Sequence, residues 1–349
     1  MNKKISLIKN IFLARIRKTP FKLNFAVTYL CNSRCKTCNI WKMYKRNSKE
    51  KDNELTLYEI KKISYNLPKT ITWISLTGGE PFLRKDIIKI IDLLSENCPS
   101  LRLISVPSNG LATQTIVSAI KKMTKIKIPN IFITFSLDGP PRVNNKIRGI
   151  KNAFERTWET YTKVKKITKH KKNFYIGLET TVSKLNINFL ESFLQDLTNK
   201  HHNVIITIAH NPFLYQNEKE PKLSPENNTN KIKKIIKIVN KDLNWFYPDQ
   251  FIKKRYLYKI PLYLKNQKHQ VVSCSALNSS VALSATGEIT PCFSWKYKLG
   301  NIRDYDYNIM GAWKSKKAEL ARKIIRNNRC PSCWTPCEAY QSIINNILK

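Results

Sequence analysis

Three cysteines on one short loop of the chain are spaced for a metal centre. Cys31, Cys35 and Cys38 form a C-x3-C-x2-C pattern directly after the apolar residues 25–30. Three thiolates can hold three irons of a cubane iron–sulfur cluster, whereas structural clusters and zinc sites normally have four protein ligands. The pattern therefore predicts a cluster whose fourth iron is open to a small molecule. A zinc knuckle with a distant fourth ligand, or three reduced thiols, is the alternative.

A glycine-rich turn follows the next apolar run, residues 71–76. It reads TGGEP and contains Gly78, Gly79 and Glu80. Paired glycines allow the backbone to approach a ligand closely. Their carbonyls and the Glu80 carboxylate suit an ammonium group. Alone, this motif is most often an ordinary turn.

Together, the cysteine loop and the TGGEP turn resemble the radical S-adenosylmethionine (SAM) superfamily of enzymes. The resemblance implies a [4Fe-4S] cluster whose open iron binds the amino and carboxylate groups of SAM. Reduction of this cluster, by a partner such as ferredoxin or flavodoxin, cleaves SAM to methionine and a 5′-deoxyadenosyl radical. That radical abstracts hydrogen from a substrate. Gly78, Gly79 and Glu80 would then contact SAM.

The segment ITFSLDGPPRVNNKIRG, residues 133–149, resembles the fourth strand and following loop of superfamily members that carry a cysteine-rich tail. The resemblance assigns Ser136 to the SAM ribose or carboxylate. It assigns Arg148 to an ion pair with the SAM carboxylate, for which a planar guanidinium is well suited. Asn109 also faces this pocket. The alternatives are a backbone-bonded hydroxyl for Ser136, a solvated charge for Arg148 and a helix cap for Asn109.

The adenine contact departs from the superfamily pattern. Members prefer an aromatic residue just before the third cysteine, but this chain has Thr37 there, so Trp41 could take that place. His210 ends the sixth predicted strand, where backbone groups often meet adenine. A lone histidine at such a position is more often structural than catalytic.

A second cysteine group lies near the end of the chain. Cys274, Gly287 and Cys292 form a C-x12-G-x4-C pattern, and residues 281–292 alternate around a turn at Gly287. This alternation predicts a β-hairpin that brings Cys274 and Cys292 together. Three further cysteines precede a short terminal helix: Cys330, Cys333 and Cys337.

The second group resembles the auxiliary-cluster extensions called SPASM and twitch. A full SPASM pattern has seven cysteines and two clusters, so five cysteines imply one auxiliary [4Fe-4S] cluster, as in twitch domains. We predict four ligands, Cys274, Cys292, Cys330 and Cys333, with Cys337 as the spare or a substitute. A zinc ribbon is the alternative, because CxxC pairs with a hairpin bind zinc well.

Strand-like and helix-like segments alternate in the first two thirds of the chain. Such alternation indicates repeated βα units around a parallel sheet. The fold class is therefore α/β, a partial (β/α)6 TIM-type barrel followed by a small cysteine-rich hairpin and helix domain. The predicted strands are 22–29, 72–76, 101–106, 130–137, 174–181 and 203–209. The predicted helices between them are 56–66, 84–97, 113–123, 154–168 and 187–200.

Active sites of such barrels lie at the carboxyl ends of the strands. Five of the singled-out residues fall there: Cys31, Gly78, Asn109, Asp138 and His210. The predicted domain organisation is a basic amphipathic segment (1–20), the barrel (21–214), a linker with two helices (215–270) and the auxiliary-cluster domain (271–349).

The charge of the chain is extreme, with 62 Lys and Arg residues against 24 Asp and Glu, a formal net charge of +38. Such a field favours polyanionic partners: RNA, an anionic lipid surface or an anionic substrate. No run of about 18 apolar residues predicts a transmembrane segment. Nine cysteines, mostly in CxxC-like groups, indicate a reducing compartment. We therefore predict a cytoplasmic location, with peripheral membrane contact as an option.

These features predict a radical SAM enzyme that abstracts hydrogen from a peptide, a sugar or another small molecule, assisted by an auxiliary cluster in electron transfer. The alternatives are a radical SAM enzyme that modifies a lipid at the membrane surface, and a zinc-stabilised basic RNA-binding protein. The sequence identifies no catalytic base. Phe293 follows Cys292 where some relatives have an acid, and Glu288 and Glu338 lie nearby in sequence.

Overall fold

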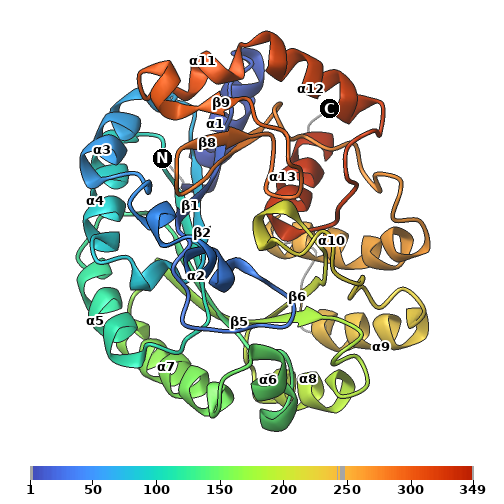
Figure 1. Ribbon diagram of the computed structural model, residues 1–349. Helices are drawn as coiled ribbons and strands as arrows, with labels where there is room; N and C mark the ends of the chain where they lie inside the picture. Colours follow the sequence, from blue (N-terminus) through green and yellow to red (C-terminus); the bar gives the residue numbers. More distant parts are fainter. Residues whose placement is uncertain (1–2, 242, 244–247, 348–349) are drawn as a thin grey trace.

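A curved sheet with six parallel strands forms the centre of the molecule (Figure 1). The computed structural model describes residues 3–241, 243 and 248–347. Strands β1 to β6 are hydrogen-bonded in sequence order, and each lies close to its predicted range. This confirms the predicted partial barrel. The strands are β1 (Lys22–Thr28), β2 (Trp73–Gly78), β3 (Leu103–Ser108), β4 (Ile131–Ser136), β5 (Phe174–Val182) and β6 (Val204–Ile208).

A ring of helices covers the outer face of this sheet (Figure 1). Each helix buries an apolar stripe against the strands, as the spacing of its apolar residues dictates. The predicted helices are present as α3 (Leu57–Asn66), α4 (Ile87–Asn97), α5 (Thr113–Met123), α7 (Ala153–Thr168) and α8 (Leu190–Asn199). A further helix, α6 (Pro141–Arg148), lies where the sequence predicted a loop. Its eight residues are too few for an amphipathic period to stand out.

The predicted hairpin of the tail is confirmed, and it joins the barrel sheet. Strand β7 (Ser280–Leu283) pairs with β8 (Glu288–Thr290) in antiparallel fashion, and β9 (Gly300–Asn301) follows. β7 also pairs in parallel with β1, with Leu23 opposite Val281. The sheet therefore continues past β1 in the order β6-β5-β4-β3-β2-β1-β7-β8-β9. The sequence did not predict this extension.

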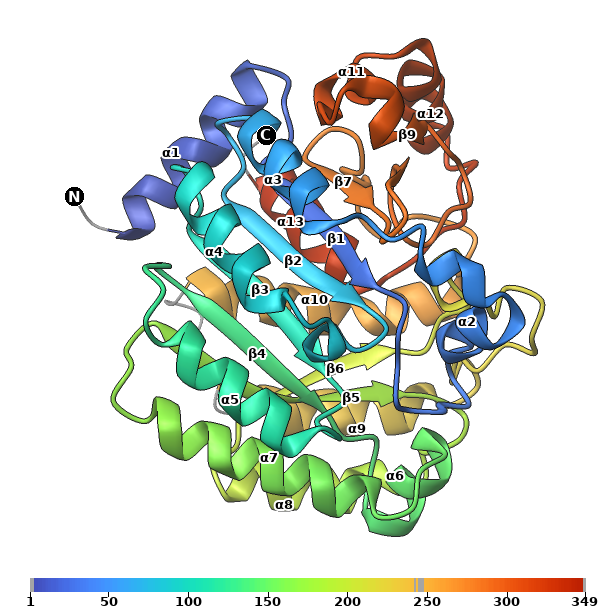
Figure 2. The same ribbon diagram turned by 60° about the vertical axis from the view of Figure 1, so that its left-hand side comes forward.

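Of the remaining helices, α9 (Thr229–Asn240) and α10 (Pro248–Lys265) continue the ring after α8 (Figure 1), and the others lie at the two ends of the barrel and along the tail. α1 (Lys3–Ile16) precedes β1 and lies at the amino-terminal end of the strands, whereas α2 (Met43–Arg46) lies at their carboxyl end (Figure 2). No described helix combines the length and apolarity that a membrane crossing needs. The other helices are α11 (Ile309–Trp313), α12 (Lys316–Arg326) and α13 (Pro336–Ile347), with short 3-10 turns at Ile40–Lys42, Ser48–Lys51, Pro81–Leu83, Phe213–Tyr215 and Ile302–Tyr305.

Candidate active site and auxiliary cysteine site

The first cysteine loop leaves the carboxyl end of β1 and is held by helix α6. The backbone N–H of Arg34 donates to the carbonyl of Arg148 (2.9 Å), and that of Lys36 donates to the carbonyl of Ile147 (2.8 Å). Two side chains also direct N–H groups at cysteine sulfurs, because Asn109 Nδ2 lies 3.7 Å from Cys31 Sγ and Arg148 Nη1 lies 3.7 Å from Cys35 Sγ.

The thiols of this loop sit in an environment that suits a bound cation. Burial raises the pKa of Cys31 to about 12, and it also raises the pKa of Cys38. A coordinated metal supplies the positive charge that keeps a buried thiolate deprotonated. The chemistry of the three thiols fits an iron–sulfur cluster, and their role as its ligands stays a prediction.

The paired glycines allow the TGGEP turn to lie directly against the cysteine loop. Gly79 N–H donates to Thr28 O, and Glu80 N–H donates to Leu30 O; the N···O distance is 2.8 Å in both bonds. A Cβ atom on Gly79 would lie 2.3 Å from Leu30 O, and one on Gly78 would lie 2.1 Å from Thr28 O. The sequence interpretation gave a different reason, close approach to a ligand, and that contact stays a prediction.

The Glu80 side chain organises the loop after β3. The side chain is fully buried; Oε2 accepts from the backbone N–H of Asn109 (2.7 Å), and Oε1 accepts from the Ser108 hydroxyl (3.0 Å). Burial raises the pKa of Glu80 to about 7, although these hydrogen bonds oppose the rise. Because both oxygens already have protein donors, an ammonium group would have to share them.

Arg148 lies between the cysteine loop and a buried carboxylate. Its Nη2 is 2.7 Å from Asp138 Oδ2, and its Nε is buried without a hydrogen-bond partner. Burial lowers the pKa of Arg148, but the negative charges of Asp138 and Cys35 outweigh it and the net shift is upward. The guanidinium therefore has two partners in the protein, Asp138 Oδ2 and Cys35 Sγ, and its Nε has none. Its ion pair with the SAM carboxylate stays a prediction.

A further acid, the half-buried Glu179, faces the same region and was not singled out from the sequence. It lies on β5 and accepts a 2.9 Å hydrogen bond from the Thr134 hydroxyl. Burial raises its pKa, and the charge of Arg148 opposes this rise. A charged residue within the otherwise apolar and β-branched run FYIGLETTV was the available signal.

Two of the predicted adenine-side residues differ in their surroundings. The indole Nε1 of Trp41 is buried with no partner, so it is available to a ligand. His210 instead links the barrel to the tail. Its Nδ1 lies 2.5 Å from Ile208 O on the barrel side, and its Nε2 accepts a 3.0 Å hydrogen bond from the backbone N–H of Trp334 in the tail. Burial lowers the pKa of His210 to about 4, which favours the neutral ring that these two bonds require. Ser136 ends β4 in a half-buried position.

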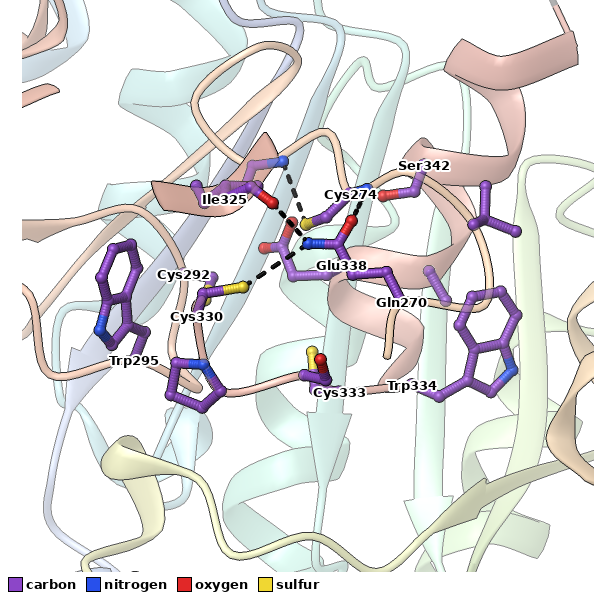
Figure 3. Close-up of a pocket in the computed structure, with 15 residues that line it drawn as sticks. Gln270, Cys274, Cys292, Trp295, Ile325, Cys330, Cys333, Trp334, Glu338 and Ser342 are labelled. Carbon is purple, nitrogen blue, oxygen red and sulfur yellow. Dashed lines mark hydrogen bonds between the residues drawn. The ribbon is translucent and has the colours of Figure 1, made fainter. Parts of the chain in front are cut away.

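Four of the five tail cysteines line one cavity (Figure 3). Cys337 is absent from the lining, and its sulfur lies 2.9 Å from the hydroxyl of Thr335. Burial raises the pKa of each lining thiol, so this donor set also fits a metal cluster. The four lining cysteines are Cys274, Cys292, Cys330 and Cys333.

Comparison with known proteins decides the family. The model of the radical SAM superfamily matches residues 25–185, and the model of an iron–sulfur cluster-binding domain, SPASM, matches residues 274–338. The chain is a radical SAM enzyme. It carries a C-terminal SPASM domain. As a member it uses a [4Fe-4S] cluster and SAM, with an auxiliary iron–sulfur cluster in the SPASM domain. This identity replaces the alternative of a zinc-stabilised RNA-binding protein.

Curated relatives match only part of this radical SAM enzyme. A GTP 3′,8-cyclase of Pasteurella multocida (strain Pm70) is 30% identical over 142 residues, which are 39% of this chain and 41% of the relative. A GTP 3′,8-cyclase of Pectobacterium atrosepticum is 36% identical over 91 residues, 26% of this chain and 27% of the relative. The chain thus spans less than half the length of these relatives.

Solved structures share the fold of the radical SAM enzyme over most of its length. Native anSMEcpe with bound AdoMet has a TM-score of 0.60 and 16% sequence identity, covering 93% of this chain and 95% of that one. The same protein with AdoMet and the Cp18Cys peptide has a TM-score of 0.58 and 17% identity, covering 88% and 83%. At this identity the likeness concerns the fold.

A buried polar cluster joins β1 of the radical SAM enzyme to its SPASM tail. Lys22 Nζ donates to Cys337 O (2.6 Å) and to Gln341 Oε1 (3.0 Å). Gln341 Nε2 in turn donates to Glu338 Oε2 (2.6 Å). Asn24 Nδ2 donates to the other oxygen of Glu338 (3.0 Å). No role for Lys22 was predicted from the sequence. The available signal was a charged residue in a strand whose other residues are mostly apolar.

Proposed function

We propose that this radical SAM enzyme reductively cleaves SAM at a cluster held by Cys31, Cys35 and Cys38, and abstracts a hydrogen atom from its substrate. Cys31, Cys35 and Cys38 would hold the cluster, which when bound would supply the electron for cleavage of the S–C5′ bond of SAM. The observation that carries this proposal is the set of three half-buried thiols on one loop, with the N–H groups of Asn109 and Arg148 directed at two of their sulfurs. Those donors stabilise thiolate ligands.

The residues around the cysteine loop support a SAM site with separate contacts for each part of the ligand. Arg148, with its free Nε, pairs with the SAM carboxylate. The Gly78, Gly79 and Glu80 turn meets the amino group, and Asn109 and Ser136 are the contacts for the remaining polar groups. Water-poor surroundings strengthen each of these hydrogen bonds.

The tail supports one auxiliary cluster, bound by Cys274, Cys292, Cys330 and Cys333, that assists electron transfer. These four thiols line one cavity and Cys337 does not. An external reductant such as ferredoxin or flavodoxin delivers the electrons. The substrate is a peptide, a sugar or another small molecule, and the net charge of +38 favours an anionic one. GTP, named in the relatives, has that charge character.

Removal of the three loop cysteines tests the proposal. The Cys31→Ala, Cys35→Ala, Cys38→Ala triple variant is expected to form no 5′-deoxyadenosine when reduced with SAM. Anaerobically purified wild type should hold about eight irons per chain, and the triple variant about four, because each [4Fe-4S] cluster contributes four. The measurements are chromatography of the nucleoside and iron analysis.

Two single variants are the controls for the second cluster. Cys333→Ala should lose about four irons, whereas Cys337→Ala should retain about eight, since Cys337 lies outside the cavity. Formation of 5′-deoxyadenosine by the triple variant would contradict the proposed SAM cluster. Loss of four irons from Cys337→Ala would contradict the ligand set of the auxiliary cluster.

Helix α1 supports an anionic membrane surface as a partner. Phe12 and Ile16 lie one helical turn apart and are 55% and 62% exposed. Residues 1–18 of the sequence contain six Lys and Arg residues and no acid. Each basic residue near an anionic surface contributes about 1 kcal/mol to binding. α1 lies at the end of the barrel opposite the cysteine loop (Figure 2), so this contact would attach the enzyme and would not present a lipid to SAM.

Vesicle binding measures this contact. The enzyme should cosediment with vesicles of phosphatidylcholine and phosphatidylglycerol, and the Phe12→Ser, Ile16→Ser double variant should bind at least about 10-fold more weakly, because inserting each side chain is worth ~1.5–3 kcal/mol. Leu320→Ser, which changes an exposed leucine on α12, is the matched control. Equal binding by the double variant and the control, or no binding at all, would rule out α1 as the membrane contact.

A further inference from the structure

Gln270 joins two of the cavity-lining cysteines through both ends of its side-chain amide (Figure 3). Its Oε1 accepts a 2.8 Å hydrogen bond from the backbone N–H of Cys274. Its Nε2 donates a 2.8 Å hydrogen bond to Ile325 O and lies 3.7 Å from Cys330 Sγ. Gln270 therefore connects the segment of Cys274 to the end of α12 and to the segment of Cys330.

These partners fix the orientation of the amide. Cys274 N–H can only donate and Ile325 O can only accept, so the amide oxygen must face the first and the amide nitrogen the second. With one hydrogen of Nε2 directed at Ile325, the second is available to the sulfur of Cys330. The reversed amide would leave both backbone groups unsatisfied at a partly buried site, and a fully buried group left in this way costs about 1–3 kcal/mol.

We propose that Gln270 is a positioning residue that donates a hydrogen bond to the Cys330 sulfur and thereby raises the reduction potential of the auxiliary cluster. The inference rests on the proposed function, which makes Cys330 a ligand. Reduction adds negative charge to a cluster and its sulfurs. An N–H group directed at one sulfur stabilises that added charge, and such hydrogen bonds are among the factors that set cluster potentials.

The surroundings make this side-chain donor important, beside the backbone N–H of Ala276 that donates to Cys274 Sγ (3.5 Å). Gln270 is the one side-chain amide among the residues that line the cavity, and much of the remaining lining is apolar. The carboxylate of Glu338 also lines the cavity, and its negative charge opposes reduction. In a site with little water a hydrogen bond acts more strongly than in solvent, so the Gln270 amide offsets part of that opposing field.

Redox titration of the holoenzyme, followed by electron paramagnetic resonance, tests the inference. Gln270→Met keeps the length of the side chain and removes the donor, so the midpoint potential of the auxiliary cluster should become more negative. Gln270→Glu should lower it further, because it adds a negative charge. The SAM cluster should keep its potential in both variants, and iron content should stay at about eight per chain.

Gln267→Met is the matched control. The Gln267 amide bonds Ser224 and Glu226, away from the cysteines, so its loss should leave both potentials unchanged. An unchanged auxiliary potential in both Gln270 variants would overturn the inference. If Gln270→Met loses iron, an unshifted potential in Gln270→Glu overturns it equally. Full iron content in Cys330→Ala would instead contradict the ligand set, so the two failures are distinguishable.

Discussion

Gly79→Ala is expected to lower 5′-deoxyadenosine formation by about 100-fold or more, the scale of loss when a reacting group is displaced by about 1 Å. A Cβ atom at this position would lie 2.3 Å from Leu30 O and 2.8 Å from Tyr29 O. Both contacts are with backbone, so no side-chain rotation can relieve them. The added methyl group must push the TGGEP turn away from the residues that lead into Cys31.

Gly177→Ala provides the comparison for Gly79→Ala. Gly177 lies on β5, and its Cβ would meet the nearest atom, Asn203 O, at 3.2 Å, which a small adjustment relieves. This variant should retain 5′-deoxyadenosine formation within a few-fold of wild type and keep all its iron. If Gly79→Ala matches it in both measurements, the close packing of the turn on the cysteine loop is not needed for SAM cleavage.

Lys22→Met is expected to destabilise the protein by about 3–5 kcal/mol. Removing one partner of a buried pair of opposite charges usually costs this much, because the other charge stays buried without compensation. Lys22 is 1% exposed, and Gln341 bridges it to Glu338, which is 2% exposed. Burial raises the pKa of Glu338 and lowers that of Lys22, while their opposite charges act against both shifts. Methionine would fill the space of the lysine stem but leave Glu338 without that positive charge. The measurement is the denaturation midpoint of the anaerobic holoprotein.

The double variant Lys22→Met, Glu338→Gln should regain part of the lost stability, because it removes the uncompensated charge as well as the lysine. Interaction energies of contacting groups usually lie at about 0.5–3 kcal/mol. Lys163→Met breaks an ion pair with Glu159 in which both side chains are about half exposed, and it should cost less than about 1 kcal/mol. A loss for Lys22→Met as small as that for Lys163→Met would show that the buried cluster contributes little.

The alternating elements of the barrel were predictable from sequence because their signals are local. Strands such as β4 and helices such as α5 show their periodicity within a dozen residues. The pairing of β7 with β1 was not predictable in this way. It joins residues about 260 positions apart, and four residues of β7 carry no mark of the strand they will contact. The short helix α6 was missed for a related reason, since two turns contain too few apolar positions to reveal a period.

The candidate site likewise has one part that was predictable from local sequence and one part that was not. The cysteines and the TGGEP turn were visible because short-range spacing determines their geometry. The partners of Arg148, Glu80 and Gln270 were not visible, since each is brought from another strand or loop by the fold. The sequence could thus name the groups predicted to bind a ligand, whereas the hydrogen bonds that orient them required the structure.

The pairing of β7 with β1 means that the tail of this enzyme is not a detachable module. β1 leads directly into the first cysteine loop, and its outer edge is covered only by β7 in the described sheet. A chain cut before residue 271 would therefore expose a strand edge with unpaired N–H and C=O groups, together with the buried charge of Lys22. An auxiliary domain taken from another protein could replace this tail only if it provided a strand that pairs with β1 in the register of β7. It would also need an acid at the position that Glu338 occupies. The two cysteine sites must consequently be engineered as a single unit.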